Sequence, residues 1–196
     1  MSNGNDIILL GGGGHCKSVI DAAESVGYNI LGILDKPELV GTRILNYEII
    51  GTDDDIPHYA DKAQFVITVG QIKSPAIRQK LAQLVERAGG RFATVIASDA
   101  YVSKYAHIGE GTVVLHKAMV NADAHIGRHC IINTMANIEH DVKIGDFCHI
   151  STGAMVNGGC IIEDETFVGS GAVLHQCAQI SKSTIVPAGT IVRKNA

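Results

Sequence analysis

The chain has 196 residues, and its 46% hydrophobic content is enough to build one large domain or two small ones. The net charge of −4, from 16 basic and 20 acidic residues, does not favour binding to a nucleic acid backbone or to an anionic membrane. No stretch reaches the roughly 18 apolar residues of a membrane span, and residues 1–6 lack the basic start of a signal peptide. We therefore expect a cytoplasmic protein with no nucleic acid partner and no membrane span.

The first hundred residues alternate predicted strands with predicted helices. Short apolar runs predict buried strands, a helical pattern stops at Gly27, and Ser74 with Pro75 is typical of the start of another helix. This alternation predicts a small parallel α/β unit. The predicted strands are 7–10, 30–34 and 65–69, and the predicted helices are about 16–26 and 74–88.

Glycines and an aspartate follow the predicted strands of this unit. The Gly11–His15 run, Asp35 and Gly70 each come directly after a strand, where ligands bind in parallel α/β sheets. Glycines let a phosphate approach the N–H groups at a helix start, and Asp35 can accept a hydrogen bond from a ribose or a base. These residues predict a nucleotide site, with a ligand-free glycine-rich turn as the alternative. Binding of NAD is disfavoured because Cys16 stands where the dinucleotide fingerprint has its third glycine.

From Val102 to Val192 an aliphatic residue recurs every six positions, with a small residue four positions after each. A hexapeptide period is typical of a parallel β-helix, in which residues 18 apart stack on successive coils. Alternation then points the aliphatic and small residues inward, and two residues turn each corner. Cys130, Cys148 and Cys160 occupy small inward positions. The five cysteines are odd in number and form no CxxC pair, which argues against disulfides and a zinc site.

The outward positions of the β-helix differ between its three faces. One face carries an apolar ladder, which indicates a covered surface; we favour a subunit interface over cover from the same chain. A second face carries residues expected in solvent, and a third is polar. The apolar ladder comprises Val113, Ile131, His149, Phe167 and Ile185, the solvent face His107, His125 and Lys143, and the polar column Asn121, Glu139, Asn157 and His175.

These features together resemble a known family. The resemblance rests on the Gly11–His15 run, on Asp35, on the hexads and on two segments, Asn133-Thr134 and Ile138-Glu139-His140-Asp141, followed by His149. The chain resembles bacterial sugar acetyltransferases in which a nucleotide-binding domain precedes a left-handed parallel β-helix of hexapeptide repeats. It is similar both to N-acetyltransferases of UDP-4-amino-4,6-dideoxy sugars and to sialic acid O-acetyltransferases.

The resemblance implies two domains that bind different substrates. A small Rossmann-like α/β domain over residues 1–98 would bind the nucleotide sugar, and a β-helix over residues 99–196 would bind acetyl-CoA, with no metal. His140 would be the general base, with Asp141 beside it. The implied sugar nucleotide contacts are Gly13, Gly14, His15, Asp35, Lys36 and Gly70, and the implied acetyl-CoA contacts are His149, Gly158, Ser170 and Ala188.

The residues around His140 support a base at this position independently. The alternation places His140 at an exposed corner between two carboxylates, Glu139 and Asp141. Imidazole titrates near neutral pH, so it can accept the proton that a sugar ammonium must lose before attacking a thioester. Asp141 is the favoured partner because Glu139 projects from the preceding face. The alternative is an inert surface histidine.

Three functions follow as hypotheses. We favour acetyl-CoA-dependent N-acetylation of a nucleotide-activated amino sugar for glycan biosynthesis, with O-acetylation of a sialic acid or a non-catalytic binding scaffold as alternatives. His140 lies at a corner and His149 on the opposite face, so the packed core separates them within one chain. This geometry predicts a homotrimer in which each active site combines His140 of one chain with His149 of another.

Overall fold

The computed structural model describes residues 4–193, which divide into two compact units. The first unit contains residues 4–70 and 76–95, and the second contains residues 71–75 and 96–193. The sequence placed the boundary after residue 98. The division between the two units falls between Val95 and Ile96, within β7 (Val95–Ile96), a strand that pairs with β10 (Val113–Val114) in a sheet of the repeats. The sequence analysis began the six-residue series at Val102. Ile96, six residues earlier, also fits the series.

The first unit is a six-stranded sheet in the order β3-β4-β2-β1-β5-β6. All adjacent strands are parallel except β3 and β4, which form an antiparallel pair. The α/β prediction is confirmed, whereas β3, β4 and β6 were not predicted. The strands are β1 (Asp6–Leu10), β2 (Asn29–Leu34), β3 (Arg43–Ile44), β4 (Tyr47–Gly51), β5 (Gln64–Ile67) and β6 (Arg91–Phe92). The helices are α1 (Gly14–Ser25), α2 (Ile56–Tyr59) and α3 (Ala76–Arg87), with 3-10 turns η1 (Pro37–Leu39) and η2 (Asp53–Asp55).

The apolar pattern of the sequence explains the centre of this sheet. Ile7–Leu10 of β1 are fully buried, as a strand covered on both faces requires. Helix α1 buries one stripe, which includes Val19 and Ala23, and then stops. Gly27 takes a φ of +80°, and its N–H donates to the carbonyl of Glu24 at 3.1 Å, so this glycine ends the helix as expected.

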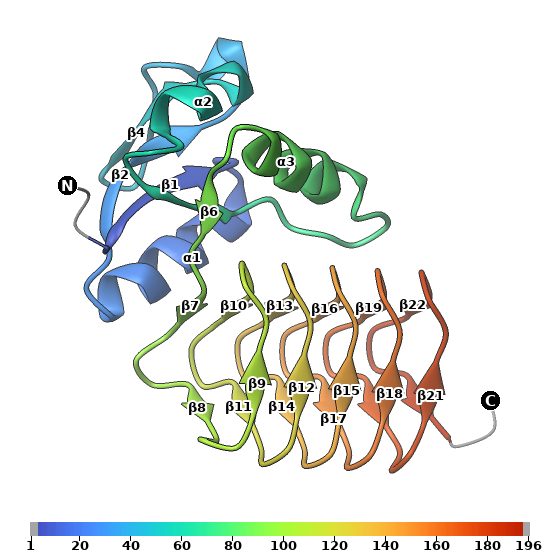
Figure 1. Cartoon of the computed structure of the whole chain (residues 1–196). Helices are drawn as coiled ribbons and strands as arrows, with labels where there is room; N and C mark the ends of the chain where they lie inside the picture. Colours follow the sequence, from blue (N-terminus) through green and yellow to red (C-terminus); the bar gives the residue numbers. More distant parts are fainter. Residues whose placement is uncertain (1–3, 194–196) are drawn as a thin grey trace. The chain divides into compact units, whose positions relative to one another are not determined.

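The second unit is a parallel β-helix of three sheets (Figure 1). We name its faces by their strands: face 1 holds β7, β10, β13, β16, β19 and β22; face 2 holds β8, β11, β14, β17, β20 and β23; face 3 holds β9, β12, β15, β18 and β21. Paired residues are 18 apart, as in Val113, Ile131 and His149, which confirms the predicted coil of three hexads.

Every strand of the β-helix is two residues long. The strands of faces 1 and 2 not yet given are β8 (Tyr101–Val102), β11 (Met119–Val120), β13 (Ile131–Ile132), β14 (Asn137–Ile138), β16 (His149–Ile150), β17 (Met155–Val156), β19 (Phe167–Val168), β20 (Val173–Leu174), β22 (Ile185–Val186) and β23 (Ile191–Val192). Those of face 3 are β9 (His107–Ile108), β12 (His125–Ile126), β15 (Lys143–Ile144), β18 (Ile161–Ile162) and β21 (Gln179–Ile180).

The corners between faces share one backbone feature, a residue with a positive φ. From Gly111 to Gly189, the second residue of each corner takes a positive φ, at intervals of six residues. Many of these residues are not glycine, and Asp141, with φ 61°, is one of them. Side chains in this left-handed region are strained, and Asn or Asp tolerate it best. The packed rungs on both sides of each corner therefore hold the turn in place.

The interior of the β-helix consists of the predicted inward residues. Cys130, Cys148 and Cys160 are buried and unbridged, so the interpretation as small core residues is confirmed. Burial raises the pKa of the Cys160 thiol, which makes it unreactive. No helix within residues 4–193 is long and apolar enough to cross a membrane.

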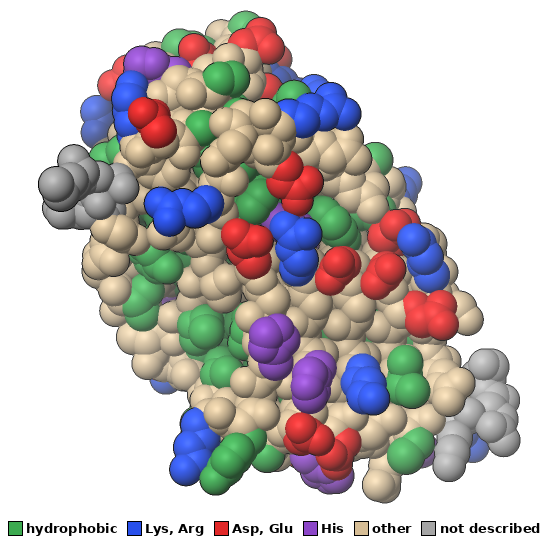
Figure 2. Space-filling model, viewed as in Figure 1, with side chains coloured by type: hydrophobic (Ala, Val, Ile, Leu, Met, Phe, Trp, Pro, Cys, Tyr) green, Lys and Arg blue, Asp and Glu red, His purple; other side chains and the backbone are tan. Residues whose placement is uncertain are grey.

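The three outer faces differ as the sequence indicated, with one correction. Val113 and Ile131 on face 1 are fully buried in the single chain, so assigning them to a subunit interface was wrong. Atoms of the same chain cover them, whereas Ile185 on the same ladder is 48% exposed. Face 3 is exposed as predicted: His107, His125 and Lys143 are exposed and stack on successive coils. Figure 2 shows histidine side chains next to a basic one on the surface of the repeats.

Candidate active site

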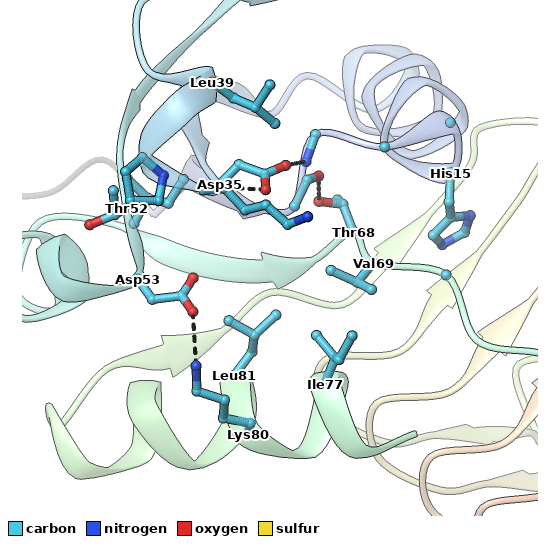
Figure 3. A pocket seen from close by; sticks show the side chains of 18 of the residues that line it. His15, Asp35, Leu39, Thr52, Asp53, Thr68, Val69, Ile77, Lys80 and Leu81 are labelled. Atoms are coloured by element: carbon cyan, nitrogen blue, oxygen red, sulfur yellow. Dashed lines mark hydrogen bonds and ion pairs between the residues drawn. The ribbon is translucent and has the colours of Figure 1, made fainter. Parts of the chain in front are cut away.

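A pocket of about 770 Å³ opens at the carboxyl ends of β1, β2 and β5 in the first unit (Figure 3). Ligands bind at this edge in parallel α/β sheets. The pocket brings together all the residues that the resemblance implied for a sugar nucleotide. They are Gly13, Gly14, His15, Asp35, Lys36 and Gly70.

The carboxylate of Asp35 organises the glycine run. Its Oδ2 accepts from the N–H of Gly12 at 2.5 Å, and its Oδ1 accepts from the N–H of Lys36 at 2.7 Å. Helix α1 then begins with Gly13 at its N-cap, without a side-chain cap and without an acidic residue in its first turn. The N–H groups at this helix start can therefore bind a phosphate.

The opposite wall of the pocket was not predicted from the sequence. Thr52 and Asp53 lie there with Leu81 and Lys80 of α3, and Lys80 Nζ lies 3.5 Å from Asp53 Oδ2 (Figure 3). Thr52 and Asp55 form a capping box at η2, a motif that could have shown where the chain turns. Two cations, Lys36 and Lys80, line the pocket together with three carboxylates, those of Asp35, Asp53 and Asp54.

His140 and Asp141 form a pair at an exposed corner between faces 2 and 3. His140 Nδ1 lies 2.6 Å from Asp141 Oδ2, so the pairing predicted from the sequence is present. This hydrogen bond raises the pKa of the His140 imidazole and lowers the pKa of the Asp141 carboxyl. Because the carboxylate accepts at Nδ1, the proton-accepting lone pair of a neutral His140 lies on Nε2.

Glu139 is held on face 2 by other partners. Its carboxylate accepts from Asn121 Nδ2 at 2.9 Å and from Asn137 Nδ2 at 3.3 Å. The hydrogen bond from Asn121 is the largest cause that lowers the pKa of Glu139. Glu139 therefore acts on His140 through its charge, while Asp141 orients the ring.

Gly158 lies against the imidazole of His140, one coil further on the same corner. A Cβ at this position would lie 2.7 Å from Cε1 and 2.8 Å from Nε2 of His140, far inside ordinary contact. Any larger residue would displace the ring or be displaced by it. The structure therefore places this expected acetyl-CoA contact beside the candidate base.

His149 lies elsewhere, at the centre of face 1, and is only 6% exposed. Its Nδ1 lies 2.5 Å from the carbonyl oxygen of Gln71 and its Nε2 lies 3.0 Å from Asn133 Nδ2. The Oδ1 atom of Asn133 accepts from the N–H of Thr134 at 2.8 Å, which orients the amide with its Nδ2 toward His149. Nδ1 therefore faces an acceptor and Nε2 faces an amide, so both ring nitrogens have partners within the second unit.

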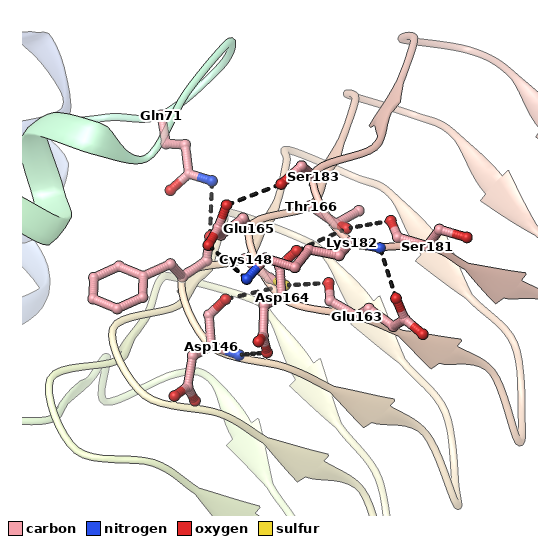
Figure 4. A network of polar contacts seen from close by, with 11 residues as sticks. Gln71, Asp146, Cys148, Glu163, Asp164, Glu165, Thr166, Ser181, Lys182 and Ser183 are labelled. Carbon is pink, nitrogen blue, oxygen red and sulfur yellow. Dashed lines mark hydrogen bonds and ion pairs between the residues drawn. The ribbon is translucent and has the colours of Figure 1, made fainter.

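The contact between His149 and acetyl-CoA stays a prediction; in the single chain both ring nitrogens lie against these partners. Gln71, which also donates from Nε2 to the carbonyl of Phe147 at 2.8 Å, is the partner that the sequence analysis missed (Figure 4). The two residues are 78 positions apart, and no local pattern links them.

The other two expected acetyl-CoA contacts lie at the corner between faces 1 and 2. Ser170 Oγ lies 2.9 Å from Ser151 Oγ, and the N–H of Gly189, next to Ala188, donates to the carbonyl of Ser170 at 2.9 Å. Within one chain, Ser170 and Ala188 thus lie along one edge of face 2, and His140 and Gly158 lie along its other edge.

The third corner carries a polar ladder that supports the coils (Figure 4). Asp164 Oδ1 accepts from the N–H of Asp146 at 2.9 Å, one coil earlier. Glu165 pairs with Lys182 at 3.0 Å and accepts from Ser183 Oγ at 2.9 Å. Across residues 4–193, no three His, Cys, Asp or Glu residues gather in a way that could hold a metal ion.

Comparison with known proteins identifies both units. Residues 6–85 match the family profile described as the PglD N-terminal domain, and residues 141–176 match the profile described as bacterial transferase hexapeptide (six repeats). Comparison with curated protein sequences gave no significant match. The chain is thus a transferase of the hexapeptide-repeat class. Its PglD-type N-terminal domain and its hexapeptide repeats are the two parts expected of a sugar acetyltransferase.

Solved structures cover nearly the whole chain. The acetyltransferase domain of PglB from Neisseria gonorrhoeae FA1090 is 28% identical, with 96% of this chain and 91% of that chain covered and a TM-score of 0.88. The same domain in complex with acetyl coenzyme A is 27% identical over 97% of this chain and 94% of that chain, also with a TM-score of 0.88. PerB from Caulobacter crescentus, in complex with CoA and GDP-perosamine, shares the fold at 22% identity, 96% and 93% coverage and a TM-score of 0.66.

Proposed function

We propose that this acetyltransferase transfers the acetyl group of acetyl-CoA to the amino group of a nucleotide-activated amino sugar, of the UDP-4-amino-4,6-dideoxy type. The observation that carries the proposal is the pair of His140 and Asp141, with 2.6 Å between Nδ1 and Oδ2, on hexapeptide repeats of a chain that also has a nucleotide-sized pocket. The bound acetyl coenzyme A in the PglB domain supports the choice of donor.

In the proposed reaction, His140 removes one proton from the sugar ammonium. Asp141 holds Nδ1–H, so Nε2 takes the proton and the resulting imidazolium faces a carboxylate that stabilises it. The amine nitrogen then attacks the thioester carbonyl carbon, the new C–N bond forms and the C–S bond breaks. The sulfur of CoA leaves with a proton returned by the imidazolium, and the amide nitrogen loses its remaining extra proton to water.

The sugar nucleotide is proposed to bind in the pocket of the first unit. Its diphosphate would accept from the N–H groups that start α1, with Lys36 and Lys80 near it. Gly13, Gly14, His15 and Gly70 would line the diphosphate and the sugar. Asp35 would act mainly by fixing the glycine run, since both of its oxygens already accept backbone N–H groups.

We further propose that a second copy of the chain completes each active site in a homotrimer. His140 lies on a convex corner with a side chain that is 55% exposed, so a donor bound there needs a second wall. Ser170 and Ala188 of the neighbour would line that wall, while His149 supports face 1 from within. Light scattering should give the mass of three chains, and a fully active monomer would contradict this assembly.

The test of the proposed function is release of free thiol from acetyl-CoA with a panel of acceptors. The panel contains UDP- and GDP-linked 4-amino sugars, their 4-hydroxy analogues and free sialic acids. Thiol release that requires the amine supports the proposal. A preference for UDP- or GDP-linked acceptors identifies the nucleobase of the substrate. Turnover only with hydroxyl acceptors would replace it with O-acetylation, and a complete lack of turnover would favour a binding scaffold.

A further inference from the structure

Arg78 of α3 is a buried cation with no part in the reaction described above. It is 1% exposed, and it is among the largest fully buried side chains of the chain. Its Nη1 donates to the carbonyl of Ile67 at 3.1 Å and to the carbonyl of Val69 at 2.6 Å. An arginine stays charged in proteins, and burying a guanidinium is costly unless polar partners hold it.

The two carbonyls lie where β5 ends and the chain enters the pocket. Ile67 is the last residue of β5, and Val69 and Gly70 line the pocket (Figure 3). One guanidinium nitrogen thus bridges both carbonyls across Thr68. This bond fixes the direction in which the chain leaves the sheet.

The same segment packs directly against the glycine run. Thr68 Oγ1 donates to the carbonyl of Gly11 at 2.5 Å. A Cβ at Gly11 would lie 2.5 Å from Cγ2 of Val69, so these two residues are in close contact. A shift of Val69 therefore moves the backbone that leads to Gly12 and Gly13. Arg78 thus contacts Val69, and Val69 contacts Gly11, the first residue of the glycine run.

The helix that carries Arg78 also borders the pocket. Ile77, Lys80 and Leu81, the neighbours of Arg78 on α3, line the pocket, and so does Val69, whose carbonyl the guanidinium holds. Arg78 therefore supports the pocket wall from behind.

We propose that Arg78 is a positioning residue for the nucleoside diphosphate part of the substrate. It holds the Val69–Gly70 turn against the glycine run, and it thereby sets the shape of the phosphate site. The proposal rests on the proposed function, since it assumes a nucleotide in this pocket. It concerns ligand binding and not the chemical step at His140.

The test compares Arg78→Met and Arg78→Lys with a control, Arg87→Met, which changes an exposed arginine on the same helix. Calorimetry with UDP and with GDP measures nucleotide binding directly, and circular dichroism checks the fold. We expect Arg78→Met to weaken binding at least ten-fold and Arg78→Lys to weaken it less, with Arg87→Met unchanged. In steady-state kinetics, KM for the sugar nucleotide should rise while KM for acetyl-CoA and kcat stay the same.

Three outcomes would overturn this role for Arg78. One is a folded Arg78→Met variant that binds UDP or GDP as tightly as the unmodified chain. Another is an equal rise in KM for the sugar nucleotide and in KM for acetyl-CoA. The third is a failure of both variants to fold, which would make Arg78 purely structural. Failure of the proposed function is recognised separately, because the unmodified chain would then bind neither nucleotide.

Discussion

Replacing Gly158 with alanine tests the geometry around His140 with a single methyl group. The new Cβ would lie 2.7 Å from Cε1 of the His140 imidazole, whereas carbon atoms in contact are normally about 3.5–4.0 Å apart. The ring must therefore move by about 1 Å, which disturbs its 2.6 Å hydrogen bond to Asp141. A misplacement of about 1 Å can cost about 100-fold in rate, which corresponds to about 2.7 kcal/mol in the activation free energy.

We expect Gly158→Ala to lower kcat about 100-fold and to leave KM for the sugar nucleotide unchanged. The assay is steady-state thiol release, with thermal unfolding as a check on the fold. Gln176→Ala, at the same corner one coil further, is the matched control and should be fully active. The double variant Gly158→Ala with His140→Ala should be no slower than His140→Ala alone, because the ring that clashes is gone. A folded Gly158→Ala with kcat within two-fold of the unmodified chain would refute the reasoning.

The remaining predictions concern the base, its partner and the nucleotide pocket. His140→Ala should lose at least about 100-fold in kcat without loss of fold, as removal of a general base does; near-normal turnover would rule out that role. Asp141→Asn keeps a residue that tolerates a φ of 61°, and it removes the main cause that raises the pKa of His140. Because the base must be neutral, the acid limb of its kcat profile should move to lower pH with a smaller loss of rate, and an unmoved limb would contradict the pairing. Asp35→Ala should raise KM for the sugar nucleotide alone, by releasing the N–H groups of Gly12 and Lys36; equal effects on both substrates would argue against a separate nucleotide site.

Much of the fold could be predicted because its signals are local. The six-residue period from Val102 to Val192 specifies which side chains point inward, and each rung repeats the same contacts 18 residues later. The pairing of His140 with Asp141 followed from the same alternation. The glycine run and Asp35 could be placed in one pocket because carboxyl ends of parallel strands share an edge.

The parts that were missed depend on contacts between distant positions. The buried chain of hydrogen bonds at His149 requires Gln71, 78 residues away, and the pocket wall at Asp53 and Lys80 joins two segments with no shared pattern. Short strands such as β3 carry too few residues to show an apolar period. The positive φ at each corner was also missed, since most side chains found there are not those that favour it.

The most direct test of the central claim follows the acetyl group itself. The chain is incubated with acetyl-CoA and an equimolar mixture of a UDP-4-amino sugar and its 4-hydroxy analogue, and the products are identified by mass spectrometry. The account predicts that the amino sugar alone gains one acetyl group and that His140→Ala abolishes nearly all of this product. Acetylation of the hydroxy analogue at a similar rate, or an unchanged yield with His140→Ala, would contradict it.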